Sequence, residues 1–176
     1  LSISREDQEE FSFRSHERAV EARDSGKFDN EIVPIILEDG SILDKDSGPR
    51  NPDKEKIKSL KPAFKDDGTV TAATSSPFSI GASAMLITSE KYAKENGLKI
   101  RAYIEGRAVA GVNWTMFGSG PIPATAKALK NTGLSMDDID VVEINEAFAA
   151  QALYCIRKAD WDESKVNLNG GAIALG

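Results

Sequence analysis

The sequence predicts an α/β fold, in which helices cover a mixed or parallel sheet. From residue 82 onward, short apolar segments alternate with segments that carry helix start and stop signals, and a β-α-β-α order of this kind is typical of such sheets. Two of the apolar segments are followed directly by an asparagine, Asn145 and Asn169. Ligands in these folds bind beyond the carboxyl ends of the strands, so both asparagines fall where a site is expected.

The first part of the chain predicts one long helix and a set of loops. Ser4 and the acid three residues later have the spacing of a capping box, and Gly26 supplies a left-handed stop for the helix between them. The apolar segment at residues 32–37 is expected to be an edge strand, because Pro34 has no N–H to donate to a neighbour. Residues 44–61 are polar and are expected to form a loop with a short helix.

The second part of the chain alternates between predicted strands and predicted helices. Ser89 is expected to cap a helix that ends at Gly97, and Gly133 is expected to end the next helix. The segment at residues 84–88 is expected to be a buried strand. Further strands are expected at residues 100–109, 139–144 and 166–168, and helices at residues 89–97, 121–132 and 148–158.

Both ends of the sequence are expected to continue into more protein. The chain starts at Leu1 and not at a methionine, and it stops at Gly176, directly after the apolar, glycine-rich run of residues 170–175. Such a run usually leads into further structure. The sequence therefore predicts an internal piece of a longer protein.

Composition excludes several classes of protein. The formal net charge is -6 and the sequence pI is about 4.9, so the chain repels the phosphates of nucleic acid. No apolar run approaches the roughly 20 residues of a membrane-spanning helix, and no membrane partner is expected. One cysteine cannot form an internal disulfide. The sequence does not fix the compartment; the cytoplasm is expected first, with the mitochondrion and the peroxisome as alternatives.

Several ordered motifs carry a resemblance to one enzyme family. Residues 145–149 read Asn-Glu-Ala-Phe-Ala, residues 167–176 read Asn-Leu-Asn-Gly-Gly-Ala-Ile-Ala-Leu-Gly, and residues 118–124 read Gly-Ser-Gly-Pro-Ile-Pro-Ala. Together with residues 3–8 and 29–34, these segments resemble the thiolases over essentially the whole chain. The resemblance implies a thiolase fold, which is a layered α/β/α architecture with mixed sheets, here incomplete, together with a loop domain.

The resemblance divides the chain into three parts. Residues 1–75 would form the loop domain, residues 76–101 the end of the N-terminal thiolase half, and residues 102–176 the start of the C-terminal half. The parent protein would then be an acyl-CoA C-acyltransferase that condenses acetyl-CoA to acetoacetyl-CoA or runs the thiolytic reverse. Coenzyme A would be substrate or product, no cofactor is expected, and the parent would form a homodimer or homotetramer.

Two alternatives stay open beside this interpretation. Within the enzymes, the alternative is a 3-ketoacyl-CoA thiolase for longer chains. From another class, the alternative is a non-catalytic thiolase-like protein that binds acyl-CoA or lipid, or serves as a structural subunit.

Thiolase chemistry assigns a role to Asn145. In the family a cysteine thiolate takes the acyl group from a thioester, and a second cysteine removes a proton alpha to a carbonyl. The developing oxyanions need fixed donors, and the asparagine of the Asn-Glu-Ala-Phe motif holds a water that forms one such hole with a histidine. The resemblance places both cysteines and that histidine outside this chain. The alternative for Asn145 is a plain helix N-cap.

Four residues are assigned to substrate binding by the resemblance. Ser76 corresponds to a serine that contacts the pantetheine arm, and Arg50 to an arginine that helps to hold the nucleotide end of coenzyme A, since a guanidinium can fork onto a phosphate. Phe148 is expected to line the acyl pocket or to be plain core. Phe117 stands where a smaller methionine is common, and its ring would shorten that pocket.

The turn around Ser76 departs from the family pattern. Pro77 replaces a small, flexible residue and has no N–H, and Ile80 replaces an acid. Both changes fall on a wall of the acyl-CoA tunnel, so they put coenzyme A binding in doubt and favour the non-catalytic alternative.

Two motif positions have open alternatives. Glu146 either orients its neighbours or only favours the start of the following helix. Gly170 and Gly171 remove side chains where a backbone passes closely, and the close partner is either a ligand or a helix.

Cys155 and His16 are expected to have no catalytic role. Cys155 lies in the middle of a predicted helix between apolar neighbours and has none of the basic surroundings of a reactive thiolate, so it is expected to be core. His16 lies in a charged helix and is expected on the solvated surface. One histidine and one distant cysteine form no metal site of recognisable spacing, so no metal is expected.

Overall fold

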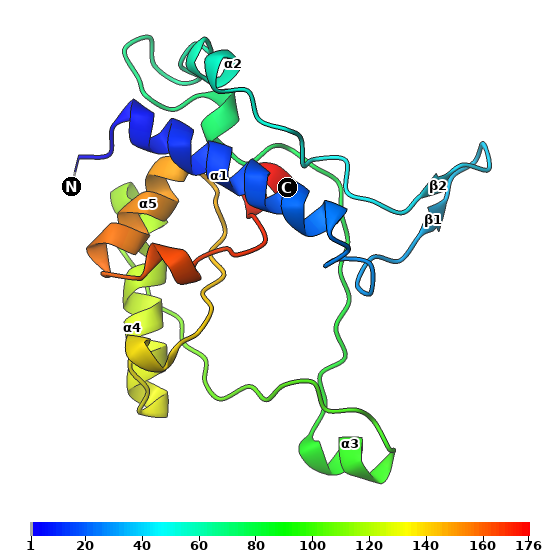
Figure 1. Ribbon diagram of the computed structural model, residues 1–176. Coiled ribbons are helices and arrows are strands. Elements are labelled where there is room, and N and C mark those ends of the chain that lie inside the picture. Colours follow the sequence, from blue (N-terminus) through cyan, green and yellow to red (C-terminus); the bar gives the residue numbers. More distant parts are fainter. Residues whose placement is uncertain (1) are drawn as a thin grey trace.

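The computed structural model describes residues 2–176, in which helices dominate and the only sheet has two strands (Figure 1). Helix α1 spans Arg5–Asp24. Its first turn is capped as the sequence predicts: the Ser4 hydroxyl accepts from the Asp7 amide, and the Asp7 carboxylate accepts from the Ser4 amide. The helix is followed by Gly26 with a φ of 75°, a left-handed conformation that glycine adopts without steric cost.

The core lies where α1 crosses two helices of the carboxyl-terminal motifs, α5 (Ala149–Lys158) and α6 (Ala172–Leu175) (Figure 1). Buried side chains recur every three or four residues along α5, so one face of that helix enters the core. Ala152 and Ile156 on this face are 0% and 1% exposed. We call α1, α5 and α6 the packed body.

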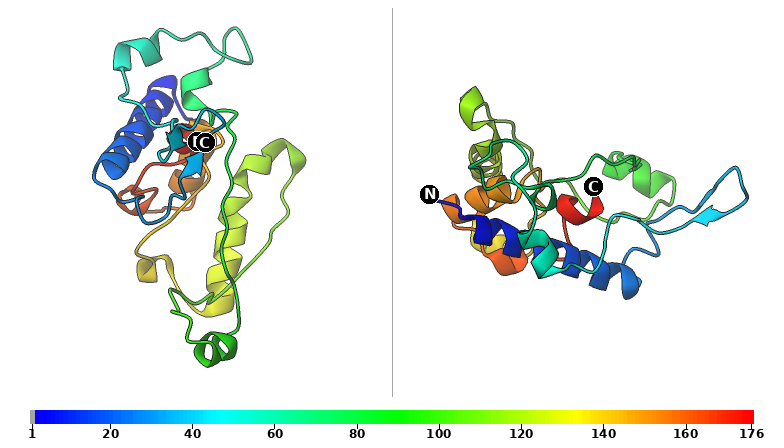
Figure 2. Two further views of the ribbon diagram at one scale, coloured as in Figure 1. Left: turned by 90° about the vertical axis from the view of Figure 1, so that its right-hand side faces the viewer. Right: turned by 90° about the horizontal axis from the view of Figure 1, so that it is seen from above.

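The chain between α1 and residue 77 surrounds one side of the packed body. Strands β1 (Ile35–Ile36) and β2 (Ile42–Leu43) form an antiparallel hairpin that projects away from the rest of the molecule (Figures 1 and 2). The edge strand predicted at residues 32–37 therefore exists only over two residues.

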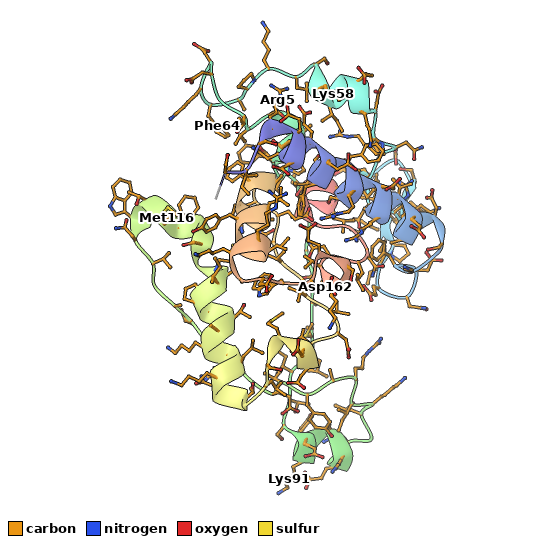
Figure 3. All side chains as sticks on the ribbon, turned by 60° about the vertical axis from the view of Figure 1, so that its left-hand side comes forward. Arg5, Lys58, Phe64, Lys91, Met116 and Asp162 are labelled. Carbon is orange, nitrogen blue, oxygen red and sulfur yellow. The ribbon has the colours of Figure 1, made fainter. Side chains whose placement is uncertain are left out.

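A short helix follows within residues 44–61, as the sequence predicts. It is α2 (Lys54–Lys58), and the Asp53 side chain caps it by accepting from two backbone amides. The Arg5 guanidinium donates to the carbonyl of Lys58 at 3.0 Å, which fixes α2 beside the start of α1 (Figure 3).

A long extended segment then leaves the packed body. We call residues 77–113 the arm; it runs out to α3 (Glu90–Glu95) and returns beside α4 (Pro121–Thr132) (Figures 1 and 2). The caps that the sequence predicts are present: Ser89 accepts at the start of α3, and Gly133 ends α4 with a φ of 72°. The remaining short elements are 3-10 helices: η1 (Ala72–Thr74), η2 (Trp114–Ser119), η3 (Met136–Asp138) and η4 (Glu163–Lys165).

The strands predicted in the arm, at residues 84–88 and 100–109, are wrong for the part of the chain that the structure describes. Both segments are non-helical but form no ladder. Their side chains are also not buried: Met85 is 85% and Leu86 is 77% exposed. A strand is held by the hydrogen bonds of a neighbour, and within residues 2–176 no second strand lies beside the arm.

The last two predicted strands meet in a minimal form. Val142 and Val166 form one parallel bridge, in which the Val142 amide donates to Lys165 and the Asn167 amide donates to Val142. This bridge places the segments that precede α5 and α6 side by side.

Within residues 2–176, none of the helices has the length and apolar character that crossing a bilayer requires.

Candidate active site

The side chain of Asn167 joins the two carboxyl-terminal motifs just before Asn145. Its Oδ1 accepts from the Ile144 amide at 2.8 Å, and its Nδ2 donates to the Ile144 carbonyl at 2.9 Å. Asn167 has a φ of 47°, a left-handed conformation that asparagine tolerates better than most residues. The backbone therefore enters Asn145 from a fixed point.

Asn145 is not a helix cap. Helix α5 begins at Ala149 with Phe148 at its N-cap position, and Phe148 makes no side-chain capping bond. Asn145 lies three residues earlier and its side chain is exposed. The N-cap alternative for Asn145 is therefore wrong, and its amide is free to face a ligand or a water.

Three of the predicted site residues line one pocket, with a volume of about 510 Å³. Asn145 and Phe148 contribute from the motif before α5, and Phe117 contributes from η2. Most of the other lining is apolar and includes Ile3. It also includes Met116 on η2 (Figure 3). We call it the Asn145 pocket; it presents the amide side chains of Asn145 and Gln151 against a largely apolar lining.

Ser76 does not line the Asn145 pocket, but it is hydrogen-bonded to Ala147, which does. Its amide donates to the Ala147 carbonyl at 3.1 Å, and its hydroxyl donates to the Ala172 carbonyl at 3.1 Å. The residue before it, Ser75, forms a bridge with Phe148. Ser76 therefore stands between the Asn-Glu-Ala-Phe motif and α6, and its hydroxyl oxygen still has lone pairs that can accept from a ligand.

Phe148 is half-buried and packs edge-on against Phe64, with ring centroids 5.9 Å apart and planes at 77°. Such an edge-to-face pair fixes the ring. Phe148 is thus both a wall of the Asn145 pocket and a contact of the interior. Its role in holding an acyl chain stays a prediction.

Arg50 lies apart from these residues, in a second pocket of about 420 Å³. This pocket, which we call the Arg50 pocket, is also lined by His16 and by Lys56. The backbone before Arg50 is held because Arg23 donates to the Pro49 carbonyl at 2.8 Å. The two pockets share no lining residue. Residues 71–76 connect them along the chain. The alanines of this segment line the Arg50 pocket, and its last residue, Ser76, is hydrogen-bonded to Ala147 of the Asn145 pocket.

His16 was expected on the surface, and this expectation is wrong. Its side chain is 4% exposed and its Nδ1 has no hydrogen-bond partner among the described residues. Burial lowers the pKa of His16, and the nearby Arg50 guanidinium lowers it further. The sequence did hold a signal, because the small residues Ser12, Ser15 and Ala19 mark the same face of α1 as buried.

Cys155 is buried in the core as expected, with 0% exposure. Its Sγ–H donates to the Gly118 carbonyl at 3.2 Å, and burial raises the pKa of the thiol. A thiol of this kind stays protonated and is a poor nucleophile. Within residues 2–176, no three His, Cys, Asp or Glu side chains gather closely enough to hold a metal ion.

Glu146 is the residue whose role the sequence left open between orientation and helix start. It lies three residues before α5, so it does not contribute to the first turn of that helix. Its carboxylate is 1% exposed and accepts from Ser15, Asn167 and the amide of Ile173. The structure therefore favours orientation.

The glycine pair before α6 is required by close packing inside the protein. Gly170 has a φ of 83°, and a Cβ there would lie 2.6 Å from the Cβ of Ala19 on α1. A Cβ on Gly171 would collide with the carboxylate of Glu146. Of the two alternatives, packing against a helix is confirmed for Gly170.

The altered turn lies outside the packed body. Pro77 is exposed, and Phe78 and Ile80 are fully exposed. Ser79 touches the end of α6, because a Cβ on Gly176 would meet the Ser79 side chain. The substituted residues therefore leave the position of Ser76 intact and change the surface next to it.

Comparisons with family models cover almost the whole chain. Residues 1–91 match the model described as "Thiolase, N-terminal domain", and residues 98–176 match "Thiolase, C-terminal domain".

Curated relatives and solved structures agree with these matches. A 3-ketoacyl-CoA thiolase of Vibrio parahaemolyticus is 54% identical over 99% of this chain, and one of Photobacterium profundum is 52% identical; 47% of each relative is covered. The Bacillus anthracis acetyl-CoA acetyltransferase and human mitochondrial 3-ketoacyl-CoA thiolase superpose with a TM-score of 0.96 each, at 44% and 43% identity, over 99% of this chain and 45% of theirs. The chain thus spans about half the length of the proteins that it matches.

Proposed function

Since the chain belongs to the thiolase family, we propose that it forms the oxyanion-stabilising and coenzyme A-binding part of an acyl-CoA C-acyltransferase. The observation that carries the proposal is the Asn145 pocket, where the amide of Asn145 and the rings of Phe117 and Phe148 line one cavity. Ser76 is hydrogen-bonded to Ala147, which lines the same cavity.

We propose the domain division expected from the sequence. Residues 1–75 form the loop domain, residues 76–101 close the N-terminal half, and residues 102–176 begin the C-terminal half. The change between the two family models, between residues 91 and 98, supports a boundary in this region.

Asn145 would act on the oxyanion of the reaction. When a thiolate attacks a thioester, the carbonyl oxygen gains negative charge before the bond between carbon and the leaving sulfur breaks. A donor that is already in place stabilises that charge at no reorganisation cost. Asn145 is suited to hold a water as this donor, because its backbone is fixed by Asn167 and its side chain is free. Cys155 is too buried to be the thiolate, which we place in the part of the relatives that this chain does not span.

Coenzyme A would lie along residues 71–76. Its phosphates suit the Arg50 pocket, where Arg50 and Lys56 supply positive charge in a chain with a net charge of -6. The neutral pantetheine arm would pass Ser76, and the thioester would reach the Asn145 pocket. A solved relative, human mitochondrial 3-ketoacyl-CoA thiolase in complex with CoA, supports this ligand.

The substrate we propose is a 3-ketoacyl-CoA, cleaved by the thiol of coenzyme A. Both curated relatives described above carry this activity in their names, and the apolar lining of the Asn145 pocket suits an acyl chain. Condensation of acetyl-CoA is the second candidate, since the acetyl-CoA acetyltransferase of Bacillus anthracis superposes equally well. Phe117 favours the shorter acyl groups, because its ring forms part of the pocket wall where a smaller side chain would leave more room. We propose a homodimer or homotetramer, in line with the dimeric peroxisomal thiolase of Saccharomyces cerevisiae.

A non-catalytic acyl-CoA-binding protein remains the candidate from another class. The observation that favours it is the altered turn, where Pro77 cannot donate and Ile80 presents an exposed apolar side chain in place of an acid.

The test uses a full-length chimera, in which residues 1–176 replace the matching segment of the Vibrio parahaemolyticus enzyme. We expect thiolysis of acetoacetyl-CoA by the chimera. Asn145→Ala should lower kcat by about 100-fold, the scale of losing one oxyanion donor, with little change in melting temperature. Asn169→Ala is the matched control, because Asn169 lies outside the Asn145 pocket and its side chain accepts from Lys27 on the surface. A chimera that binds coenzyme A but turns nothing over would favour the non-catalytic candidate.

A further inference from the structure

Glu146 follows Asn145 directly but does not line the Asn145 pocket. Its carboxylate turns into the interior instead. Oε2 accepts from the Ser15 hydroxyl at 2.7 Å and from the Ile173 amide at 3.1 Å, and Oε1 accepts from Asn167 Nδ2 at 2.8 Å. These donors belong to three separate segments: α1, the chain before α6, and the first turn of α6.

We propose that Glu146 is a positioning residue, which holds Asn145 and the start of α6 at a fixed separation on α1. The inference rests on the proposed function, because it gives Asn145 a geometry that catalysis needs. An acid or base role does not fit Glu146, since its oxygens are enclosed and already accept three hydrogen bonds. The side chain instead couples the two motifs that flank the site.

The residues around the Glu146 carboxylate supply hydrogen bonds, space and a nearby positive charge. Ser15 accepts from the Gly171 amide at 3.1 Å while it donates to Glu146, so the hydroxyl relays the contact to the glycine pair. A side chain on Gly171 would collide with the carboxylate. The guanidinium of Arg18 lies close by and donates to the Val166 carbonyl at 2.6 Å, which places a positive charge near a buried negative one.

A glutamine cannot replace the carboxylate in this network. Asn167 presents Nδ2 to Glu146 because its Oδ1 is committed to the Ile144 amide, so its amide cannot flip. Ile173 presents a backbone N–H on the other side. One end of a glutamine side chain is a donor, so Glu146→Gln leaves Asn167 or Ile173 facing another donor.

The experiment is a double-mutant cycle in the full-length chimera, with Asn145→Ala and Glu146→Gln. We expect Glu146→Gln alone to lower kcat about 10- to 100-fold with KM within about twofold, the scale of a small misplacement of a catalytic group. In the Asn145→Ala background the same change should lower kcat by less than about twofold, since Glu146 acts through Asn145. Ile156→Val is the control, because it alters the core of α5 and has no polar contact with the network.

Amide hydrogen exchange gives a second readout that needs no activity. In Glu146→Gln, residues 143–148 and 170–176 should exchange faster, while α4 should be unchanged; Ile156→Val should not single out these segments. Equal losses of kcat in both backgrounds, or unchanged exchange in both segments, would overturn the inference. If the unmutated chimera shows no turnover, or Asn145→Ala leaves kcat unchanged, the proposed function fails, and the exchange experiment still decides whether Glu146 positions the motifs.

Discussion

Similar apolar side chains are buried in the packed body and exposed in the arm. On α5, Ile156 is 1% exposed, whereas in the arm Ile87 is 67% and Met85 is 85% exposed. The helices of the packed body find their partners within the chain, as α1, α5 and α6 do. The arm finds no partner strand within residues 2–176, and yet 99% of the chain superposes on a solved acetyl-CoA acetyltransferase with a TM-score of 0.96.

The difference shows which parts of this fold are self-sufficient. The arm lies within the 99% of the chain that superposes on the solved structure, of which this chain covers 45%. Exposed apolar segments of this length mark surfaces that pack against further protein. We propose that the arm becomes a set of buried strands in the full-length protein, whereas the packed body and the pocket beside it are already formed.

The largest expected effect concerns catalysis by the chain alone. We predict no thiolase turnover for residues 1–176, because Cys155 is buried, has a raised pKa and donates to Gly118, and no second cysteine is present. A coupled thiolysis assay on the purified chain checks this. Turnover that disappears in Cys155→Ala would show that the packed body holds its own nucleophile and would contradict the prediction.

The next effect tests how tightly the packed body is built. Gly170 and Gly133 both have left-handed backbones, with φ of 83° and 72°, but only Gly170 is crowded: a Cβ would lie 2.6 Å from Ala19, while nothing lies within 4 Å of a Cβ on Gly133. In the chimera, Gly133→Ala should cost about 1 kcal/mol of unfolding free energy, the strain of the backbone alone. Gly170→Ala should cost about 3 kcal/mol or more, since overpacking is added. Urea denaturation measures both free energies of unfolding. Equal costs would show that α1 shifts away from a Cβ at residue 170 without a further loss of stability.

The sequence predicted local features of the fold better than distant ones. The capping box at Ser4 and the glycine stops at Gly26 and Gly133 depend on contacts within a few residues, and all are present. The strands of the arm depend on neighbours that a local pattern cannot supply.

The candidate site divides in the same way. The motif order pointed to Asn145, and the structure brings it together with Phe117 and Phe148. The sequence did not decide the role of Glu146, because one of its hydrogen-bond donors, Ser15, is 131 residues away in the sequence. The burial of His16 was missed because its helix is rich in charge and the face of small residues is easily overlooked.

A third prediction concerns the boundary between the packed body and the arm. Pro77 and Ile80 follow Ser76 and are exposed, so their substitution should change the ligand surface without disturbing the core. In the chimera, Pro77→Gly with Ile80→Asp should tighten coenzyme A binding by about tenfold, which corresponds to about 1.4 kcal/mol. Calorimetric titration measures the dissociation constant. The control is Ser76→Ala, which should weaken binding; tight binding that the double substitution leaves unchanged would show that the altered turn is harmless.

The smallest expected effect is a dependence of stability on pH that comes from His16. Burial and Arg50 hold the pKa of His16 below its ordinary value of 6.5. The unfolded chain therefore binds a proton more readily, and the free energy of unfolding should fall as the pH drops below about 6.5 and continue to fall until the folded pKa is reached. Above that range the contribution is constant.

The measurement compares the chimera with its His16→Gln variant, in which the buried side chain stays polar but cannot titrate. Between pH 7.5 and 5, the unmutated chimera should lose more stability than the variant, because the unfolded chain takes up the proton first. Saturating coenzyme A should reduce this difference, because a phosphate in the Arg50 pocket offsets the positive charge of Arg50 and makes a protonated His16 less costly. Parallel pH profiles of the two proteins would show that His16 is solvated after all. A difference that persists in full with coenzyme A would place the phosphates outside the Arg50 pocket.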